Sequence, residues 1–443
     1  MMGLMASEEI RTVETRTAMS PTERGAAAAA PNPPETTPGA GRTRAWATRL
    51  VVVGIMLSAL NLRPAITSLG ALLEEVRDGL GMSGSVAGLL TSVPPLCFAV
   101  FGVMAPRLAR RFGPAAVVCA GMAAIATGLV IRPYVGNTAG FLAASALALM
   151  GIAVSNVLMP VIVKRWFPDR VGSMTGLYSM ALAAGTSLAA ALTVPLTDAM
   201  DGNWKSGLVV WATIAAAAVL PWLPLLRDRG PADARTQEPA ADTAEQQAPL
   251  RITRSRTAWS LAVFFGLQAT AAYITMGWMP QIFRDAGVPA GTAGVLLAVT
   301  MVMGVPLAFV IPRVATRLPH QGPIVLVLGV CGLAGYAGLY LAPSGGAWAW
   351  ALLLGVSNCA FPLALTMVGM RARSGAGVAQ LSAFAQSTGY LISIPGPLLV
   401  GVLYQQSGGW GLPIALMAAL MVPQMVVGFI AGRDRTVEDE ATR

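Results

Sequence analysis

Residues 88–111 of this chain read GLLTSVPPLCFAVFGVMAPRLARR, and residues 294–317 read GVLLAVTMVMGVPLAFVIPRVATR. At this offset of 206 residues the identical pairs include Gly88 with Gly294, Pro106 with Pro312, Arg107 with Arg313 and Arg111 with Arg317. At an offset of 202 residues, SNVLMP (155–160) matches SNCAFP (357–362) and Pro195 matches Pro397. Because separate segments agree on nearly one offset, the sequence predicts two copies of one structural unit.

The two copies lie in a chain whose composition is typical of a membrane protein. Of its 443 residues 55% are hydrophobic and only 12% are charged, and the mean hydropathy is +0.63, whereas soluble domains carry about 25% charged residues. A spanning helix needs roughly 20 mostly apolar residues. The segments that meet this requirement are 46–69, 85–106, 114–133, 138–163, 173–197, 204–226, 258–280, 289–312, 323–342, 347–370, 378–402 and 411–431.

These segments predict an all-α membrane protein with twelve transmembrane helices in two pseudo-symmetric six-helix bundles. Parallel repeats of this kind enclose one central cavity, and rocking of the bundles opens it to each side in turn. The predicted domains are a disordered cytoplasmic tail (1–45), a first bundle (46–226), a polar linker (227–257), a second bundle (258–431) and a second cytoplasmic tail (432–443). The linker is rich in Pro and Ala and is typical of a flexible connection.

The distribution of cations predicts the orientation of these helices. Of the 30 Lys and Arg residues, all but five fall on the side of the predicted helices that also carries both termini. The five exceptions are Arg63, Arg77, Arg132, Lys205 and Arg284. The positive-inside rule therefore predicts cytoplasmic termini and a multi-pass protein of the plasma membrane. This asymmetry also accounts for the net charge of +9, so no nucleic-acid partner is expected.

Two longer stretches carry a resemblance to a known family. They are LNLRPAITSLGALLEEVRDGLGMSGSVAGLLTSVPPLCFAVFGVMAPRLARRFG (60–113) and FGLQATAAYITMGWMPQIFRDAGVPAGTAGVLLAV (265–299). Twelve helices in two repeats, with a basic loop after the second helix, resemble the major facilitator superfamily. Within it, these stretches resemble the cyanate permease/nitroimidazole transporter family, CynX/NimT, and the similarity extends over nearly all of 46–431.

The resemblance implies a transporter that works without ATP, without a cofactor and without enzymatic activity. The implied substrates are cyanate-like or other small anions or nitro-heterocycles, carried by alternating access across a bacterial inner membrane, and the fold works as a monomer. One position departs from the superfamily pattern. Its loop after the second helix usually carries an Asp where this chain has Pro106, so Arg107, Arg110 and Arg111 are interpreted as topology anchors or as gating residues.

Arg63, in SALNLRPAITSL (58–69), is the first candidate for substrate binding. A cation this deep in a membrane helix costs several kcal/mol unless it is paired. Glu74 and Glu75 lie too far along the chain to neutralise it. Pro64 removes a backbone donor and is expected to loosen the helix at Arg63. The planar guanidinium suits a carboxylate or nitro group. The alternative, a structural Arg63 that reaches the headgroups or helix-end carbonyls, stays open.

Polar residues within other predicted helices are further candidates for the cavity wall. They are Asn61, Asn156, Tyr178, Gln268, Tyr273, Asn358 and Gln386. For each, a hydrogen bond between helices is an equally good explanation. Trp278, near the predicted end of its helix, is interpreted as part of an aromatic belt at the membrane surface.

Two other functions compete with the leading one. The first is a drug or metabolite exporter in which Arg63 is structural. Export of cations usually needs a carboxylate in the cavity, and all 21 Asp and Glu residues fall outside the middle of the predicted helices. The second is a membrane enzyme or sensor, which would need a nucleophile cluster, a metal set or a soluble domain. The four Cys residues lie singly in apolar runs, and His320 is the one His, so no metal site is expected.

Overall fold

The structure, a computed structural model, describes residues 38–226 and 252–441. The chain divides into two compact units, residues 1–46 and residues 47–443, and nearly all of the described residues belong to the second unit. The predicted tail lies outside the described residues up to residue 37, and so does most of the predicted linker, up to residue 251.

The first half of the chain, up to residue 226, forms eight α-helices and four 3₁₀ turns in its described part. These are α1 (Pro38–Asn61), α2 (Pro64–Ala71), α3 (Leu73–Leu80), α4 (Gly84–Phe112), α5 (Pro114–Ile131), η1 (Arg132–Tyr134), α6 (Thr138–Trp166), η2 (Pro168–Arg170), α7 (Val171–Asp198), α8 (Trp204–Val219), η3 (Leu220–Trp222) and η4 (Pro224–Leu226).

The second half, from residue 252, forms one 3₁₀ turn and ten α-helices in its described part. These are η5 (Ile252–Arg254), α9 (Arg256–Asp285), α10 (Ala290–Val302), α11 (Gly304–Arg317), α12 (Gly322–Leu341), α13 (Ala347–Asn358), α14 (Ala360–Met370), α15 (Gly375–Ser393), α16 (Pro395–Ser407), α17 (Gly411–Ala431) and α18 (Val437–Ala441).

The prediction of twelve membrane-spanning helices is confirmed. Twelve helical stretches in the described part of the chain are long and apolar enough to cross a membrane, and each overlaps one predicted segment. The sixth differs in its ending. It was expected to run to residue 226, but α8 ends at Val219 and gives way to 3₁₀ turns, because Pro221 and Pro224 cannot donate the hydrogen bonds that continue an α-helix.

Several spans are interrupted within the membrane-spanning stretch. The breaks lie between α1 and α2, α10 and α11, α13 and α14, and α15 and α16. At the first, Pro64 begins α2 and Arg63 precedes it with φ −125° and ψ −28°, which confirms that this helix is interrupted at Arg63. Pro395 similarly begins α16. A break exposes backbone groups and redirects side chains, so it is a place where irregular backbone can border a cavity.

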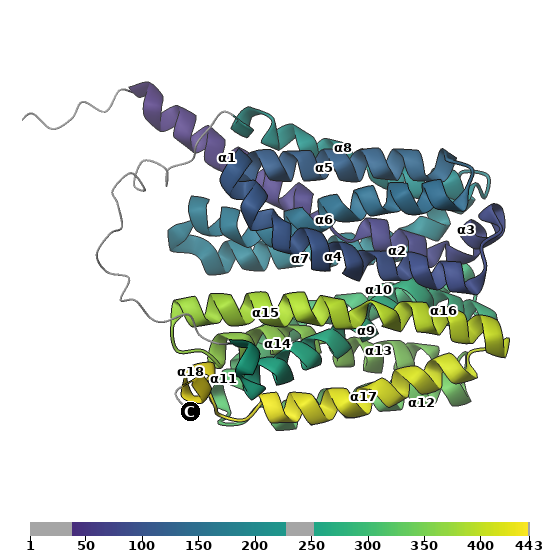
Figure 1. The fold of residues 1–443 in the computed structure, drawn as a ribbon. Helices are drawn as coiled ribbons and strands as arrows, with labels where there is room; N and C mark the ends of the chain where they lie inside the picture. Colours follow the sequence, from purple (N-terminus) through teal and green to yellow (C-terminus); the bar gives the residue numbers. More distant parts are fainter. Residues whose placement is uncertain (1–37, 227–251, 442–443) are drawn as a thin grey trace, which may run out of the picture. The chain divides into compact units, whose positions relative to one another are not determined.

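The spans of each half lie together, and the two halves meet along several helix pairs, which include α4 with α15 and α2 with α9. Figure 1 shows the first half in purple to teal and the second in green to yellow. Helix α4 packs on α16, and α7 packs on α10. Glycines permit this close approach. A Cβ on Gly401 would lie 2.4 Å from the Gly84 carbonyl oxygen, and a Cβ on Gly294 would lie 2.4 Å from that of Ala190. Small residues let helix backbones approach in membrane proteins.

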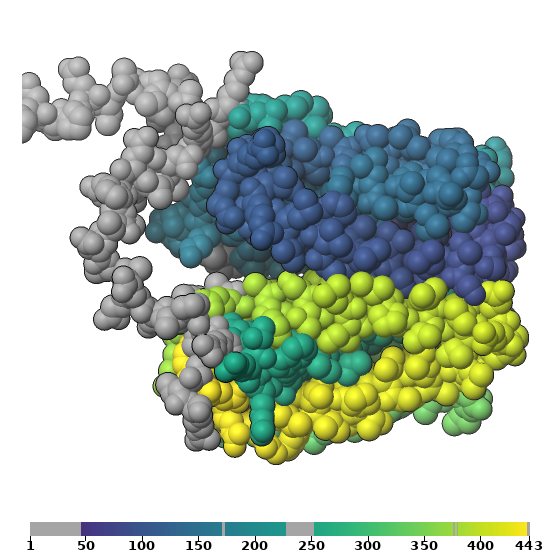
Figure 2. Space-filling view, in the orientation of Figure 1, coloured from purple at the N-terminus to yellow at the C-terminus, as the bar shows by residue number. Residues whose placement is uncertain are grey.

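The two ends of the spans differ in how the halves meet. We call the end that carries residues 226 and 252 the linker end, and the end that carries the turns at 81–83 and 286–289 the far end. The glycine contacts of Gly84 and Gly294 lie in the first turns of α4 and α10, at the far end. In Figure 2 the surfaces of the halves touch at the far end and separate toward the linker end.

At the linker end, the segment after α17 is fastened to its own half. Buried Arg371 donates to the carbonyl oxygens of Ala431 (3.0 Å) and Gly432 (2.7 Å), and it pairs with Asp434 at 3.4 Å. Burial lowers the pKa of Arg371, while Asp434 acts in the opposite direction. Residues 432–441, predicted to be a tail, therefore include an anchored segment.

Glu440 of α18 completes this anchor at the start of α9. Its carboxylate accepts hydrogen bonds from the Ser255 hydroxyl (2.6 Å), the Thr257 hydroxyl (2.8 Å) and the Thr257 amide (3.1 Å). Partial burial alone raises the pKa of Glu440, but these hydrogen bonds outweigh it and hold the pKa below its usual value. A carboxylate at a helix N-terminus is also favoured by the helix dipole.

Candidate functional site

A cavity of about 450 Å³ lies between the two halves. Its volume falls within the range of small-molecule sites. The first half contributes Arg63 and part of α7, and the second half contributes parts of α9, α10, α11, α13, α14 and α15. Gly304 and Cys359, which lie at helix breaks, also line it. Three of the four helix breaks, at Arg63, Gly304 and Cys359, thus border the cavity, as expected for irregular backbone within a membrane protein.

The cavity extends toward the linker end. A second hollow of about 290 Å³ lies between α7 and the α10–α11 span. It shares lining residues with the cavity, namely Ser179, Ala183, Met301, Gly304 and Ala308. On α7 the hollow reaches Thr175, near the linker-end terminus of that helix, and on α11 it reaches Phe309, in the middle of the helix. A solute in the cavity therefore lies closer to open space at the linker end than at the far end.

Arg63 is the charged residue of the cavity wall. Among the described residues that line the cavity there is no Asp, Glu or His, and no ion pair joins Arg63 to a described carboxylate. The Arg63 side chain is half-buried and donates a hydrogen bond to the Tyr273 side chain. Arg63 also interacts electrostatically with Tyr178 and Tyr390. Three phenol dipoles thus surround a cation that lacks a counter-charge from the described wall.

Aromatic rings cover the wall beside this cation. Tyr390 stacks on Phe98, with ring centroids 5.0 Å apart and planes 26° apart. Phe265 meets Tyr390 edge to face at 5.2 Å and lies 5.7 Å from Phe361. The cavity is lined by the rings of Phe265, Phe361 and Tyr390. A flat solute there would therefore contact these aromatic rings as well as the Arg63 guanidinium. That combination suits a planar group that carries a negative charge or a strong dipole.

The structure brings some of the predicted binding residues to the cavity. Arg63, Gln268, Tyr273 and Asn358 line it. The Gln268 amide nitrogen donates to the Asn358 carbonyl oxygen at 3.4 Å, and its Oε1 has no hydrogen-bond partner among the described residues. These two polar residues therefore leave hydrogen-bonding capacity at the wall opposite Arg63.

The other predicted residues lie outside the cavity lining. Asn61 is buried, and its amide donates to the Leu57 carbonyl oxygen at 3.0 Å. The Tyr178 hydroxyl donates to Asn156 at 2.7 Å, so this pair joins α7 to α6 behind the wall. Gln386 donates to the Ser382 hydroxyl one helical turn away. Tyr178 and Asn156 thus make the interhelical hydrogen bond that was the alternative explanation, whereas Asn61 and Gln386 bond within their own helices.

At the far end, an ion-pair cluster closes the space between the halves. Arg284 of α9 lies 2.8 Å from a Glu74 oxygen and 2.9 Å from a Glu75 oxygen, both on α3. Asp285, beside it, accepts hydrogen bonds from the Tyr404 hydroxyl (2.8 Å) and the Trp410 indole (2.7 Å). Glu74 and Glu75 therefore form ion pairs with Arg284 of the other half and do not neutralise Arg63.

Trp278 belongs to this closure, and its interpretation as part of an aromatic belt is wrong. Its side chain is buried, and its indole donates to the Thr91 hydroxyl of the first half at 3.1 Å. Its ring centroid lies 5.8 Å from that of Trp410 and 6.2 Å from that of Tyr404. The adjoining rings exclude water from the far end of the cavity.

Arg107, Arg110 and Arg111 lie at the linker end of α4, where their side chains are exposed. Arg111 lies over the Phe112 ring, with its guanidinium carbon 5.2 Å from the ring centroid. In the described part of the chain, none of the three forms an ion pair. Their surroundings are therefore compatible with contact to a charged membrane surface.

Sequence reasoning missed several residues of this site. Tyr390 and Phe361 were not among the predicted residues, although Tyr390 follows the candidate Gln386 by four residues and so shares its helix face. Arg284 and Arg132 were counted only as exceptions to the charge asymmetry. These arginines fall on the same side of the predicted helices as several acidic residues. They could therefore have been marked as candidates for ion pairs with those acids.

The similarities to known proteins agree with this architecture. The family model described as Major Facilitator Superfamily matches residues 51–393. The 2-nitroimidazole transporter of Escherichia coli (strain K12) is 32% identical over 394 residues, which cover 88% of this chain and 96% of that protein. The cyanate transport protein CynX of the same organism is 29% identical over 374 residues, covering 84% and 94%.

The fold also matches solved structures. The crystal structure of the nucleoside transporter NupG gives a TM-score of 0.68 at 13% sequence identity, with 87% of this chain and 98% of that chain covered. At this identity the likeness concerns the fold alone.

Proposed function

This chain belongs to the major facilitator superfamily, in the group of its 2-nitroimidazole and cyanate transporter relatives, and we propose that it carries a small planar anion or nitro-bearing solute. It is a multi-pass membrane transporter of small solutes rather than an enzyme. Arg63 is proposed as the recognition group, and Gln268, Tyr273 and Asn358 as further contacts. Cyanate and nitro-heterocycles are the first substrates to test.

The observation that carries this proposal is the environment of Arg63. A cation without a counter-charge from the described wall favours a ligand that supplies one. The fork of a guanidinium donates two parallel hydrogen bonds to the paired oxygens of a carboxylate or nitro group. The rings of Phe265, Phe361 and Tyr390 provide flat apolar surface beside it. An exporter of cationic drugs would place its charged substrate against Arg63, which is electrostatically unfavourable.

We further propose that transport follows alternating access between the halves 46–226 and 258–431. The far end is closed by contacts between halves, and the cavity extends toward the linker end. Movement of one half against the other would open the far end and close the linker end. The cation asymmetry supports a cytoplasmic linker end and cytoplasmic termini, in the inner membrane of a bacterial cell. The cavity is enclosed within one chain, so a monomer suffices.

The test is uptake by proteoliposomes that contain the purified full-length protein. We expect saturable uptake of cyanate, a carboxylate or a nitro-heterocycle by the wild type. Arg63→Gln removes the charge and should lower uptake at least 100-fold, since a lost bidentate pair to a charged group costs about 3 kcal/mol. Arg63→Lys keeps the charge without the fork and should fall between the two.

Arg254→Gln is the matched control, because it removes an exposed arginine outside the cavity. It should transport like the wild type, and a melting temperature for each variant checks the fold. Equal stabilisation of wild type and Arg63→Gln by neutral or cationic drugs, without uptake of any anion, would contradict the proposal. That result would favour an exporter in which Arg63 is structural.

A further inference from the structure

A second arginine of the first half, Arg132, lies at a small pocket that is separate from the transport cavity. Its side chain is 2% exposed. Nη1 donates to the Ala65 carbonyl oxygen at 3.0 Å, and Nη2 lies 3.5 Å from the Ser68 hydroxyl. Nε has no hydrogen-bond partner among the described residues. The Phe141 ring, with its centroid 5.9 Å from the guanidinium carbon, offers a weak attraction.

No described carboxylate forms an ion pair with Arg132. A fully buried cation without a counter-charge is costly inside a membrane protein. The contacts with Ser68 and Phe141 are weak, and Ala65 supplies one carbonyl oxygen. These groups use only part of the hydrogen-bonding capacity of the guanidinium and leave its positive charge uncompensated. Arg132 therefore differs from an arginine whose role is to hold helix ends by hydrogen bonds.

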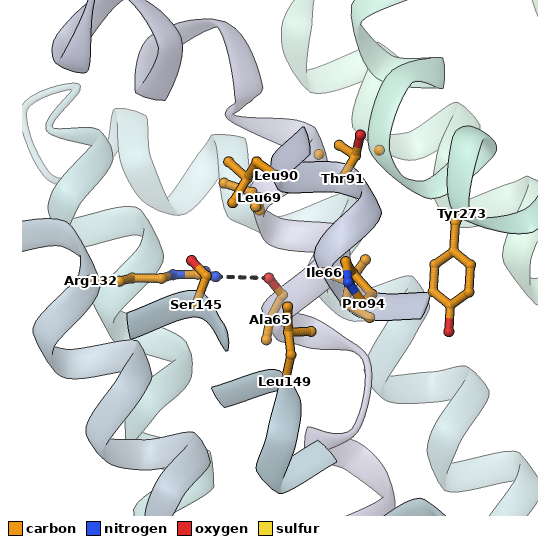
Figure 3. A pocket seen from close by; sticks show the side chains of 12 residues that line it. Ala65, Ile66, Leu69, Leu90, Thr91, Pro94, Arg132, Ser145, Leu149 and Tyr273 are labelled. Carbon is orange, nitrogen blue, oxygen red and sulfur yellow. Dashed lines mark hydrogen bonds between the residues drawn. The ribbon is translucent and has the colours of Figure 1, made fainter. Parts of the chain in front are cut away.

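A second orphaned donor points to the same place. The Ser145 side chain is 1% exposed, and its hydroxyl has no hydrogen-bond partner among the described residues. Arg132 and Ser145 both line a pocket of about 20 Å³. Figure 3 shows these two side chains next to each other, with the aliphatic residues Leu69, Leu90 and Leu149 around the same pocket.

We propose that this pocket binds a halide-sized monovalent anion, with chloride as the natural candidate. A volume of 20 Å³ holds about one water molecule or one ion of similar size. A water molecule could accept from the guanidinium N–H and donate to the hydroxyl, but it would leave the positive charge of Arg132 uncompensated. A halide accepts from both and cancels the charge of Arg132. Cyanate, carboxylates and nitro compounds are too large for this volume.

Helix α9 of the second half covers the site. Tyr273 and Gly277 complete the pocket wall, and a Cβ on Gly277 would lie 2.7 Å from the Thr91 side chain. Tyr273 also lines the transport cavity and bonds Arg63. An anion at Arg132 would thus be buried in this conformation, on the other side of Tyr273 from the transport cavity. The site is independent of the proposed substrate.

The test measures the melting temperature of the purified full-length protein against bromide or chloride concentration. Gluconate holds the ionic strength constant, because it is too large for the pocket. We expect halide to raise the melting temperature in a saturable way. Ser145→Val removes one donor and occupies pocket volume, so the half-effective halide concentration should rise at least tenfold. Arg132→Gln is the stronger change but removes a buried core residue, so it is secondary.

Arg63→Gln serves as the control, because it alters the transport cavity and leaves this pocket intact. It should keep the halide response of the wild type even if the proposed transport function fails. Bromide-soaked crystals should give an anomalous peak between Arg132 Nε and Ser145 Oγ. No halide response in the wild type, an unchanged response in Ser145→Val, or a loss of the response in Arg63→Gln would overturn the proposal.

Discussion

The far end and the linker end use the same kinds of residue in opposite ways. At the far end an ion-pair cluster joins the two halves, where Arg284 pairs with Glu74 and Glu75. At the linker end ion pairs join parts of the second half to each other, as Arg371 does with Asp434. Charges that tie the halves together hold one end closed, whereas charges that tie a half to itself leave the other end free to separate.

Glycine placement shows the same contrast. Gly401 of α16 approaches the backbone of α4 so closely that no Cβ fits without a shift, and Gly294 does the same on α7. Toward the linker end, a Cβ on Gly176 would lie 3.9 Å from the Phe309 ring, and one on Gly304, at the break in the middle of its span, would meet nothing within 4 Å. Tight backbone contact at one end and free space at the other are what a transporter open at one end requires.

The largest effect is expected when the far-end contact is forced apart. Gly401→Val places side-chain carbons against the backbone of Gly84 and Gly88. Overpacking costs about 1–3 kcal/mol, which should shift the equilibrium about 5- to 150-fold away from this conformation and lower uptake correspondingly. Ser179 is exposed and lines both the cavity and the hollow toward the linker end. Modification of a Ser179→Cys reporter, introduced into each variant, by a polar thiol reagent and followed by mass spectrometry therefore reports how open the linker end is.

That modification should slow in Gly401→Val, because closure of the linker end shields position 179. Gly369→Val is the matched control, since a Cβ on Gly369 meets nothing within 4 Å. Modification at the wild-type rate in a well-folded Gly401→Val protein would show that the far-end contact does not govern the linker end.

A smaller shift in the same direction is expected from Arg284→Gln. Losing this guanidinium leaves Glu74 and Glu75 facing each other without their cation, so the far end should open more easily. The three side chains are partly exposed, so we expect a shift of about 1 kcal/mol between the two conformations, or roughly a fivefold slower modification of the Ser179→Cys reporter. Lys205→Gln, which removes a far-end cation from the first half, should leave the rate unchanged. An effect of equal size in both variants would point to net charge rather than to the ion pairs.

At the linker end, Glu440→Gln should affect stability rather than transport, because its contacts stay within one half. The folded-state pKa of Glu440 is depressed, so its stabilisation is present above the unfolded value of about 4.3 and is lost as pH falls through the folded value. We expect Glu440→Gln to lower the free energy of unfolding by about 1–2 kcal/mol at pH 7. Below about pH 5 its melting temperature should fall less steeply than that of the wild type.

The matched control for Glu440 is Asp201→Asn, which removes an exposed carboxylate at a turn with φ 59° that Asn also adopts. The melting temperature of Asp201→Asn should follow the wild-type pH curve. If Glu440→Gln does the same, the carboxylate contributes nothing to the anchor.

The smallest effect is expected for Arg110→Gln. Arg110 is exposed and has no ion pair in the described part of the chain, so stability should change by less than about 0.5 kcal/mol. Uptake should stay within about twofold of the wild type if Arg110 acts as a topology anchor. A tenfold loss of uptake with unchanged stability would instead assign it a role in gating.

The sequence alone determined the repeated architecture, the twelve spans and the break at Arg63. These features depend on local quantities: the length of apolar runs, the offset between matching segments, and the missing amide of Pro64. Hydropathy and proline chemistry act over a few helical turns, so they can be read without knowing the fold. For the same reason the sequence singled out Arg63 as a cation that needed an explanation.

Only the tertiary structure decided which groups meet. It placed Tyr273 and Tyr390, more than 200 residues away in sequence, beside Arg63, and it gave Glu74 and Glu75 to Arg284. It also directed the Arg132 side chain into a separate small pocket rather than into the transport cavity. Such pairings depend on how each helix is rotated and on how closely the glycines of facing helices allow them to approach. Neither quantity is carried by hydropathy or by the spacing of motifs.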